Sequence, residues 1–271
     1  MIKAPGPATT SSMRGTFFQA PIEIRIEIQG EKWKQGETIS GTVTFKNRGS
    51  APAKASEATI SLARGTLKKV QKKDPEALDI VETHALEAAG LASELAPGTE
   101  ITKPFSFKLG ANAFITDTVT SLFVVVGKVS ATQTSWPVLQ LQVEPSDVIV
   151  EFVKTFTIEH HFAFKDYKAT KNGVQAKLDP PDGQSYSSLD GLDVNFWFKG
   201  TEGHEDLEVD YGFVVKKVKP NVASVTYLKE KRPVSQTFSR LQYMTPSGRV
   251  NFDEIRKGIE GALAALSKNP F

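Results

Sequence analysis

The chain has 271 residues, of which 39% are apolar and 24% are charged, and its formal net charge is +2. This composition is typical of a globular protein, and the length suits two domains of roughly 130 residues each. So small a net charge gives no indication of nucleic-acid binding. The absence of cysteine excludes disulfides, thiolate metal sites and cysteine nucleophiles.

The N-terminal segment does not resemble a targeting sequence. Residues 1–16 are rich in proline, serine and threonine and lack the apolar core of a signal peptide. No apolar run in the chain approaches the roughly 20 residues of a membrane span. We therefore expect a flexible tail over residues 1–16 and a cytoplasmic protein without a membrane span.

Alternation of apolar and polar residues predicts β-strands through the first half of the chain. Residues 22–28 are four isoleucines separated by three charged residues, so they predict a first strand with a solvated charged face. The run 122–126 is apolar throughout and predicts a central strand. Further strands are predicted at 38–45, 58–62, 101–109 and 139–143. Together these strands predict an antiparallel β-sandwich over residues 17–144.

Two motifs in this half resemble those of a known superfamily. A W-x-x-G-E-x-I-x-G-x-V-x-F run extends from Trp33 to Phe45, and a P-F-x-F-x-L run extends from Pro104 to Leu109. Both resemble the N-terminal half of the arrestin fold, and within that superfamily the two-domain bacterial sporulation-control protein M family. The run L-E-V-D-Y, ending at Tyr211, resembles that family's L-E-V-D-R strand, with tyrosine where the family tends to place arginine. The resemblance implies a non-enzymatic adaptor or scaffold that binds a protein partner.

The second half repeats the alternating pattern after a joint at residues 144–147. Apolar residues of one parity between Val148 and Phe164 predict a long, bent strand, and Lys171-Asn172-Gly173 predicts a hairpin turn. More strands are predicted at 192–198, 207–215 and 234–243. We expect residues 145–271 to form a second antiparallel sandwich.

Near the C-terminus, the spacing of the apolar residues changes from that of a strand to that of a helix. Asn251 can cap a helix, with Glu254 at the spacing of a capping box. An apolar stripe follows at helical spacing, made of Phe252, Ile255, Ile259, Leu263 and Leu266. We therefore predict a C-terminal α-helix over about residues 251–267. Residues 79–95 stay ambiguous, because their composition favours a helix whereas the arrestin-like resemblance implies a strand near 80–86, which we prefer.

One basic cluster is a candidate contact surface, formed by Arg64, Lys68, Lys69, Lys72 and Lys73. Such a cluster can receive phosphate or acidic lipid headgroups. It can equally be a solvated loop whose lysines protect sheet edges. We favour the second interpretation because Asp74 and Glu76 follow immediately. Peripheral membrane contact and homo-oligomerisation both stay open.

The sequence indicates no catalytic, cofactor or metal site. Adjacent His160 and His161 would point to opposite faces of a strand, so they cannot chelate one ion, and we expect His160 to be a hydrogen-bonded interior residue. Four aspartates near glycine turns lack the calcium-loop spacing and are interpreted as turn residues: Asp179, Asp182, Asp190 and Asp193. Glycine-rich phosphate loops and nucleophile-elbow motifs are absent.

We therefore predict an all-β protein that binds a partner protein of unknown identity through sheet edges or a groove between its domains. The alternative is a carbohydrate-binding or carbohydrate-active β-sandwich, in which sugars stack on exposed tryptophans. The three candidates for such a platform are Trp33, Trp136 and Trp197.

Overall fold

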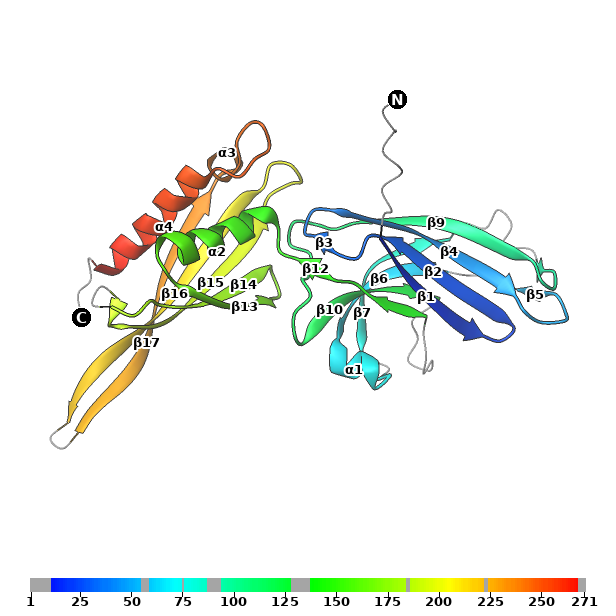
Figure 1. The fold of residues 1–271 in the computed structure, drawn as a ribbon, viewed down its shortest axis with the longest axis horizontal. Coiled ribbons are helices and arrows are strands. Elements are labelled where there is room, and N and C mark those ends of the chain that lie inside the picture. Colours follow the sequence, from blue (N-terminus) through cyan, green and yellow to red (C-terminus); the bar gives the residue numbers. More distant parts are fainter. Residues whose placement is uncertain are drawn as a thin grey trace, which may run out of the picture. The chain divides into compact units, whose positions relative to one another are not determined.

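The computed structural model describes residues 11–54, 59–74, 76–86, 94–127, 137–183, 186–221 and 224–267. The chain divides into two compact units (Figure 1). The first comprises residues 1–109 and 115–144, and the second comprises residues 110–114 and 145–271.

The first unit is a sandwich of two four-stranded antiparallel sheets. One sheet has the order β1-β2-β4-β9 and the other the order β11-β10-β6-β7. The first sheet consists of β1 (Ser12–Gln19), β2 (Ile22–Gln29), β4 (Thr38–Asn47) and β9 (Glu100–Lys108). The second consists of β11 (Val138–Gln140), β10 (Thr120–Val126), β6 (Thr59–Thr66) and β7 (Leu78–Ala85). Two short pairs complete the unit: β3 (Trp33–Lys34) with β12 (Val143–Glu144), and β5 (Ala53–Lys54) with β8 (Glu94–Leu95).

Strand β2 shows both the success and the limit of the alternation pattern. Its four isoleucines are buried, as predicted. The charged face is not uniformly solvated, because Glu23 is only 5% exposed and accepts a hydrogen bond from Arg48 Nε at 2.7 Å. This strand is also not the first. β1 begins at Ser12 and pairs along the whole of β2, so the predicted tail over residues 1–16 is wrong for residues 12–16.

A short helix explains why β10 is apolar on both faces. Helix α1 (Leu67–Gln71) packs Leu67 and Val70 against a cluster on the outer side of the second sheet. That cluster consists of Ala63, Ala77, Leu78, Phe123 and Val125. The other face of β10 belongs to the sandwich interior, where Val124 is fully buried. The prediction of a central strand at residues 122–126 is confirmed.

Residues 78–85 form a strand, which resolves the ambiguity of 79–95 in favour of the arrestin-like resemblance; residues 87–93 lie outside the described part of the chain. The strand predicted at 101–109 is confirmed as β9. The strand predicted at 139–143 is instead split between β11 and β12, which pair with different neighbours.

The second unit is built on one five-stranded antiparallel sheet of order β13-β14-β15-β16-β17. Its strands are β13 (Ala163–Ala169), β14 (Val174–Asp179), β15 (Leu189–Lys199), β16 (Asp206–Asn221) and β17 (Ser224–Phe238). Helices α2 (Asp147–Glu159) and α4 (Phe252–Ser267) lie side by side on one face of it (Figure 1). The predicted class of tandem antiparallel β units with a C-terminal helix is confirmed. Among the described residues, helices supply the layer opposite this sheet.

Helix α2 corrects the prediction of a long strand between Val148 and Phe164. Its buried residues include Val148, Ile149, Phe152, Val153 and Phe156, a spacing that fits the period of a helix. Apolar residues also occupy the alternate positions of this segment, interrupted by Lys154 and His160, so the two periods overlap in the sequence. The strand period is the wrong one, and the strand that follows, β13, begins only at Ala163.

Helix α4 buries a narrower stripe than predicted. Ile255, Ile259 and Ala262 are fully buried, whereas Phe252 is 54% exposed. The helix is tied to the sheet through Gln236 of β17, whose Nε2 donates to the Gly258 carbonyl at 2.9 Å and whose Oε1 accepts from the Tyr211 hydroxyl at 3.0 Å. Tyr211 is fully buried, so this departure from the family motif is a core residue.

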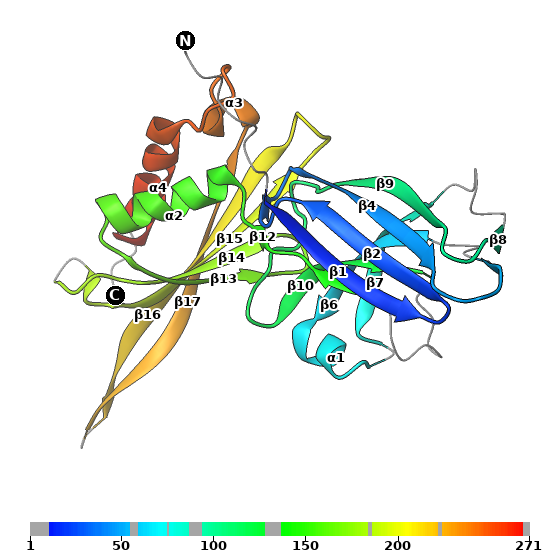
Figure 2. The same cartoon turned by 45° about the vertical axis from the view of Figure 1, so that its right-hand side comes forward.

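Strands β16 and β17 extend beyond the rest of the sheet. β15 pairs with β16 only as far as Val215, and the remainder of β16 pairs with β17 alone as a two-stranded ribbon (Figure 2). The strand predicted at 234–243 ends at Phe238, and a short helix, α3 (Arg240–Tyr243), follows. A capping box between Ser239 and Gln242 begins that helix.

The segment 110–114 joins the second unit although it lies between β9 and β10 in the sequence. The Asn112 side chain forms two hydrogen bonds with the backbone of Phe198, one from its Nδ2 to the carbonyl and one from the Phe198 N–H to its Oδ1, both 2.7 Å. β14 pairs with β15 only as far as Phe196, so the amide of Asn112 satisfies backbone groups of β15 beyond the end of β14.

Candidate functional site

The two lateral sides of the first unit differ. On one side, β1 lies against β11, and a Cβ atom placed on Gly15 would approach the Leu139 side chain to 2.6 Å. On the other side, the edge strands are β7 and β9. Within the described residues, β7 pairs only with β6, and β9 pairs only with β4. Within the part of the chain that the structure describes, the sandwich is therefore open along β7 and β9, and the outer edge of β7 pairs with no other strand.

A pocket of about 690 Å³ lies at this opening. Its apolar lining comes from both sheets and consists of Ile60, Ala85, Leu86, Pro104 and Phe105. The polar lining consists of His84, Lys103 and Ser106. A pocket with mostly apolar walls and a few polar groups suits an apolar side chain whose backbone remains at the rim.

His84 is held in a fixed position at the rim of this pocket. Its ring stacks on Phe107 with the ring centres 4.8 Å apart, and its Nε2 lies 2.5 Å from Glu82 Oε1. Ser106 also lines the pocket, so a serine, a histidine and a carboxylate occur near one another. However, Ser106 lies between the buried Phe105 and Phe107 on β9, so its side chain points to the opposite face of that strand. The three residues therefore do not form a nucleophile–base arrangement.

The β7 edge has exposed apolar side chains and neither proline nor lysine, although a β-bulge interrupts it. Ile80 is 44% exposed and Val81 is 56% exposed. Val81 has no partner in the register, because Leu62 pairs with Glu82 and the next pair is Ala63 with Ile80, so it is the extra residue of a β-bulge. No proline or lysine occurs between Leu78 and Ala85.

The other edges are less suited to accept a strand. Pro104 lies within β9 and Pro233 within β17, and a proline has no N–H to offer to an added strand. β13 contains Lys165 at a register shift, and lysines on an edge discourage pairing. Among β7, β9, β13 and β17, β7 is the edge strand that contains neither proline nor lysine.

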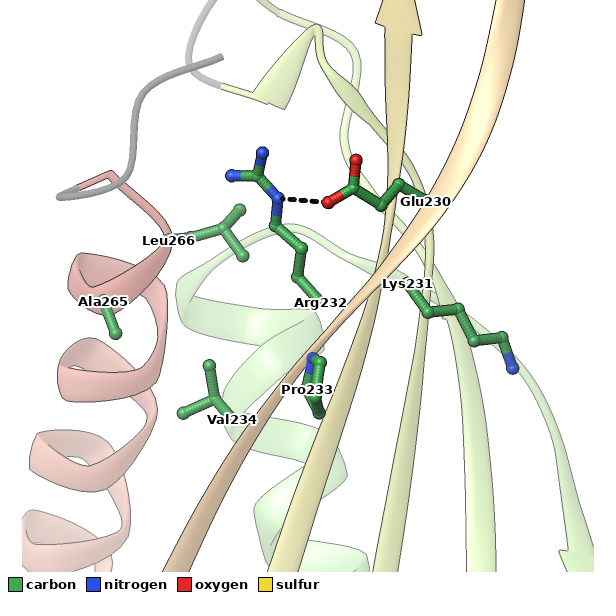
Figure 3. A pocket seen from close by; sticks show the side chains of 7 residues that line it. All are labelled: Glu230, Lys231, Arg232, Pro233, Val234, Ala265 and Leu266. Atoms are coloured by element: carbon green, nitrogen blue, oxygen red, sulfur yellow. Dashed lines mark ion pairs between the residues drawn. The ribbon is translucent and has the colours of Figure 1, made fainter.

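A second pocket, of about 440 Å³, lies along the edge of β17 in the second unit (Figure 3). Its walls are residues 230–234 of β17 together with Ala265 and Leu266 near the end of α4. The Arg232 guanidinium lies beside Glu230, with Nε 3.5 Å from Oε1. Pro233 lies in the middle of this wall, so an added strand would lack one hydrogen bond there.

The predicted basic cluster lies on and beside α1. Arg64 is on β6 and pairs with Asp79 of β7 at 2.6 Å, so its charge is compensated. Lys68 and Lys69 lie on α1, and Lys72 and Lys73 lie in the turn that follows; all four are exposed. Among the residues that the structure describes, none of these four lysines has a carboxylate within ion-pair distance.

The aspartates of the second unit bind lysines and do not form a metal site. Asp179 pairs with Lys165 at 2.8 Å, and Asp190 pairs with Lys229 at 2.5 Å. The hydrogen bond from Lys229 holds the pKa of Asp190 below its usual value. Asp190 and Asp193 lie within β15, so their interpretation as turn residues is wrong. The described residues contain no group of three or more histidines and carboxylates that could hold a metal ion.

Two further expectations need correction. His160 is the C-cap of helix α2, and its buried Nε2 has no hydrogen-bond partner among the described residues, so it is not the hydrogen-bonded strand residue that we predicted. Trp33 is only 5% exposed and cannot serve as a sugar platform. Trp136 lies outside the described residues, which leaves the half-exposed Trp197 on β15.

Comparison with solved structures finds a protein with a similar fold. The crystal structure of the sporulation control protein Spo0M from Bacillus subtilis matches with a TM-score of 0.61 at 15% sequence identity, and the match covers 91% of this chain and 99% of that one. The chain has the fold of Spo0M. The predicted resemblance to arrestin-like sporulation-control proteins is confirmed at the level of the fold.

The remaining comparisons add nothing to the Spo0M match. Two β-glucosidase structures from Listeria innocua match with TM-scores of 0.26 and 0.25, cover about half of this chain and 17% of theirs, and are 14% identical. Scores this low give no support to a carbohydrate function. No family model and no curated protein matches the sequence.

The site within this Spo0M fold could be predicted only in part. The sequence indicated that sheet edges were candidates, but it did not indicate which edge. One signal was available, because Ile80 and Val81 are adjacent apolar residues that break the alternation of β7 and so indicate a bulge. The pocket has no such signal, since its walls come from strands on different sheets that are distant in the sequence.

Proposed function

We propose that this protein is a cytoplasmic, non-enzymatic adaptor that binds an extended segment of a partner protein along the β7 edge of its first unit. The observation that supports the proposal is the opening between β7 and β9, which combines an unpaired strand edge with an apolar pocket. An added strand would hydrogen-bond to the backbone of β7 and place one side chain in the pocket. The Spo0M counterpart is a sporulation control protein, which agrees with a regulatory binding role.

A binding role suits the pocket better than catalysis does. The pocket's histidine already contacts Glu82 and stacks on a buried ring, and Ser106 is directed to the other face of its strand. A base without a nucleophile in reach supports no covalent step. The same residues are well placed for recognition, because the stacked His84 ring gives the pocket a rigid wall.

The proposal is tested by panning a library of random sixteen-residue peptides, displayed on phage, on the full chain. Selected peptides are synthesised and their dissociation constants measured by fluorescence anisotropy. Val81→Pro is expected to weaken binding at least tenfold, because proline removes an N–H from the edge. The variant should still fold, since Val81 is a bulge residue outside the register with β6 and bulges on edge strands tolerate proline.

Two further variants distinguish binding in the pocket from binding along the strand edge. One of them is a control for general effects of a large substitution on folding. His84→Trp puts a larger ring on the face of β7 that lines the pocket and should also abolish binding, whereas Ala96→Trp places the same side chain on an exposed turn of the same unit and should leave binding unchanged. Hydrogen exchange of residues 78–85 should slow when the peptide is bound. Peptides that bind Val81→Pro and His84→Trp as tightly as the original chain would refute the proposal.

A further inference from the structure

We infer that the partner segment is acidic at one end and apolar at the other, with the two features about six to eight residues apart. The inference rests on the proposed function, because it specifies which extended segment the β7 edge accepts. The observations that support it are the lysines of α1 and its following turn, which have no carboxylate partner in the described part of the chain, at one end of β7 and the apolar pocket at the other.

The lysines of α1 differ from the other lysine-rich region of the chain. In the β16–β17 hairpin, Lys216, Lys217, Lys229 and Lys231 all lie within 4 Å of a carboxylate. The exposed lysines of α1 and its following turn, by contrast, have no carboxylate partner in the described part of the chain. Asp74 and Glu76 follow in the sequence, and Asp74 accepts the Glu76 N–H within the turn. The four lysines carry four positive charges and the two acidic residues carry two negative ones, so this region has a net charge of +2.

The position of this charge relative to β7 is fixed by packing. Leu67 and Val70 of α1 contact the cluster that contains Ala77 and Leu78, where β7 begins. The apolar pocket includes Ala85 and Leu86, where β7 ends. β7 has eight residues, so the two features are separated by roughly 25 Å of extended chain. Figure 1 shows α1 beside one end of β6 and β7.

An extended peptide on this edge would meet the two environments in sequence. Side chains near Leu78 would lie within range of the lysines, where carboxylates are attracted through a partly screened field. A side chain near Ala85 would enter the pocket, where leucine or an aromatic residue would lose its contact with water. An acidic residue in the pocket, or a basic residue beside α1, would be disfavoured, so the arrangement also selects against other segments.

The experiment uses the peptides selected from the phage library. They are expected to contain aspartate or glutamate and, six to eight residues away, a leucine or aromatic residue. Lys69→Glu combined with Lys72→Glu should weaken the affinity of such peptides by about tenfold at low ionic strength, and the loss should shrink in high salt. Lys171→Glu combined with Lys199→Glu, a pair of exposed lysines in the second unit, is the matched control and should change the affinity less than twofold.

The outcomes separate the two proposals. Peptides that require the β7 edge but ignore the charge reversal at α1 would overturn this inference and leave the adaptor function standing. Peptides that ignore both Val81→Pro and the charge reversal would overturn both. Co-sedimentation with phosphatidylserine vesicles that depends on Lys69 and Lys72, while peptide binding does not, would assign the lysines to a membrane surface and refute the inference.

Discussion

Two glycines of helix α4, three residues apart, should respond in opposite ways to the same substitution. In the middle of a helix, glycine is less favourable than alanine by about 0.8–1.0 kcal/mol, so alanine normally stabilises. A Cβ atom on Gly261 would have Gln236 Nε2 as its nearest neighbour at 3.5 Å, which is an ordinary contact. Gly261→Ala should therefore increase the free energy of unfolding by about 0.5–1 kcal/mol.

Gly258 faces the sheet instead. A Cβ atom there would overlap Cζ of Phe238 and lie 2.6 Å from its Cε1. Phe238 cannot easily move, because it is 6% exposed and packs edge-on against Phe152 with the ring centres 5.4 Å apart. Overpacking of this kind costs about 1–3 kcal/mol. After the helix-propensity gain is subtracted, Gly258→Ala should destabilise the unit by about 0–2 kcal/mol.

Urea unfolding followed by circular dichroism at 222 nm is a suitable assay, because the two long helices, α2 and α4, both belong to the second unit. The two variants should differ by about 2 kcal/mol in the free energy of unfolding. If Gly258→Ala stabilised the protein as much as Gly261→Ala, α4 would lie farther from β17 than the structure shows, and the reasoning would be wrong.

Two other variants and one fragment test separate features of the structure. Tyr211→Phe should lower the free energy of unfolding by about 1 kcal/mol, because it leaves Gln236 Oε1 without its donor; urea unfolding measures this. Arg48 lowers the pKa of Glu23 through its hydrogen bond, so the pair stabilises the fold above the ordinary glutamate pKa and loses that effect as the pH falls through the lowered value. Arg48→Leu should therefore reduce the melting temperature at pH 7, with a smaller difference in acid. Residues 11–144 expressed alone should unfold cooperatively; a fragment without a sigmoidal melt would place the boundary elsewhere.

The alternation of apolar residues predicted much of the first unit because its strands are half-buried and one period dominates. Residues 22–28 and 101–109 are strands at or within a residue of the predicted bounds. The burial of Glu23 was not predictable from that alternation, because it depends on Arg48, which lies on the far side of β4 in the sequence. Tertiary partners of this kind have no local signal.

The second unit was predicted less well because two periods coincide in one segment. Between Val148 and Phe156, apolar residues occupy every second position except Lys154, and they also occupy the positions of one helix face. Helix-favouring flanks, Ser146 before the segment and Asp147 in its first turn, were the available evidence for a helix. The candidate site could not be predicted because only the folded chain shows that β7 and β9, the last strands of two different sheets, line one pocket.

Residues 110–114 belong to the second unit but are synthesised before the last strands of the first unit. This position in the sequence determines when their hydrogen bonds can form during synthesis. Asn112 leaves the ribosome 86 residues before its partner Phe198, which at typical translation rates is a delay of about 4–17 seconds. All strands of the first unit have been synthesised once residue 144 has emerged, so its sheets can form within that interval. The first unit would then fold around a loop that still lacks its partner. The end of β15 can be completed only after Phe198 has been synthesised, when the side chain of Asn112 is already available.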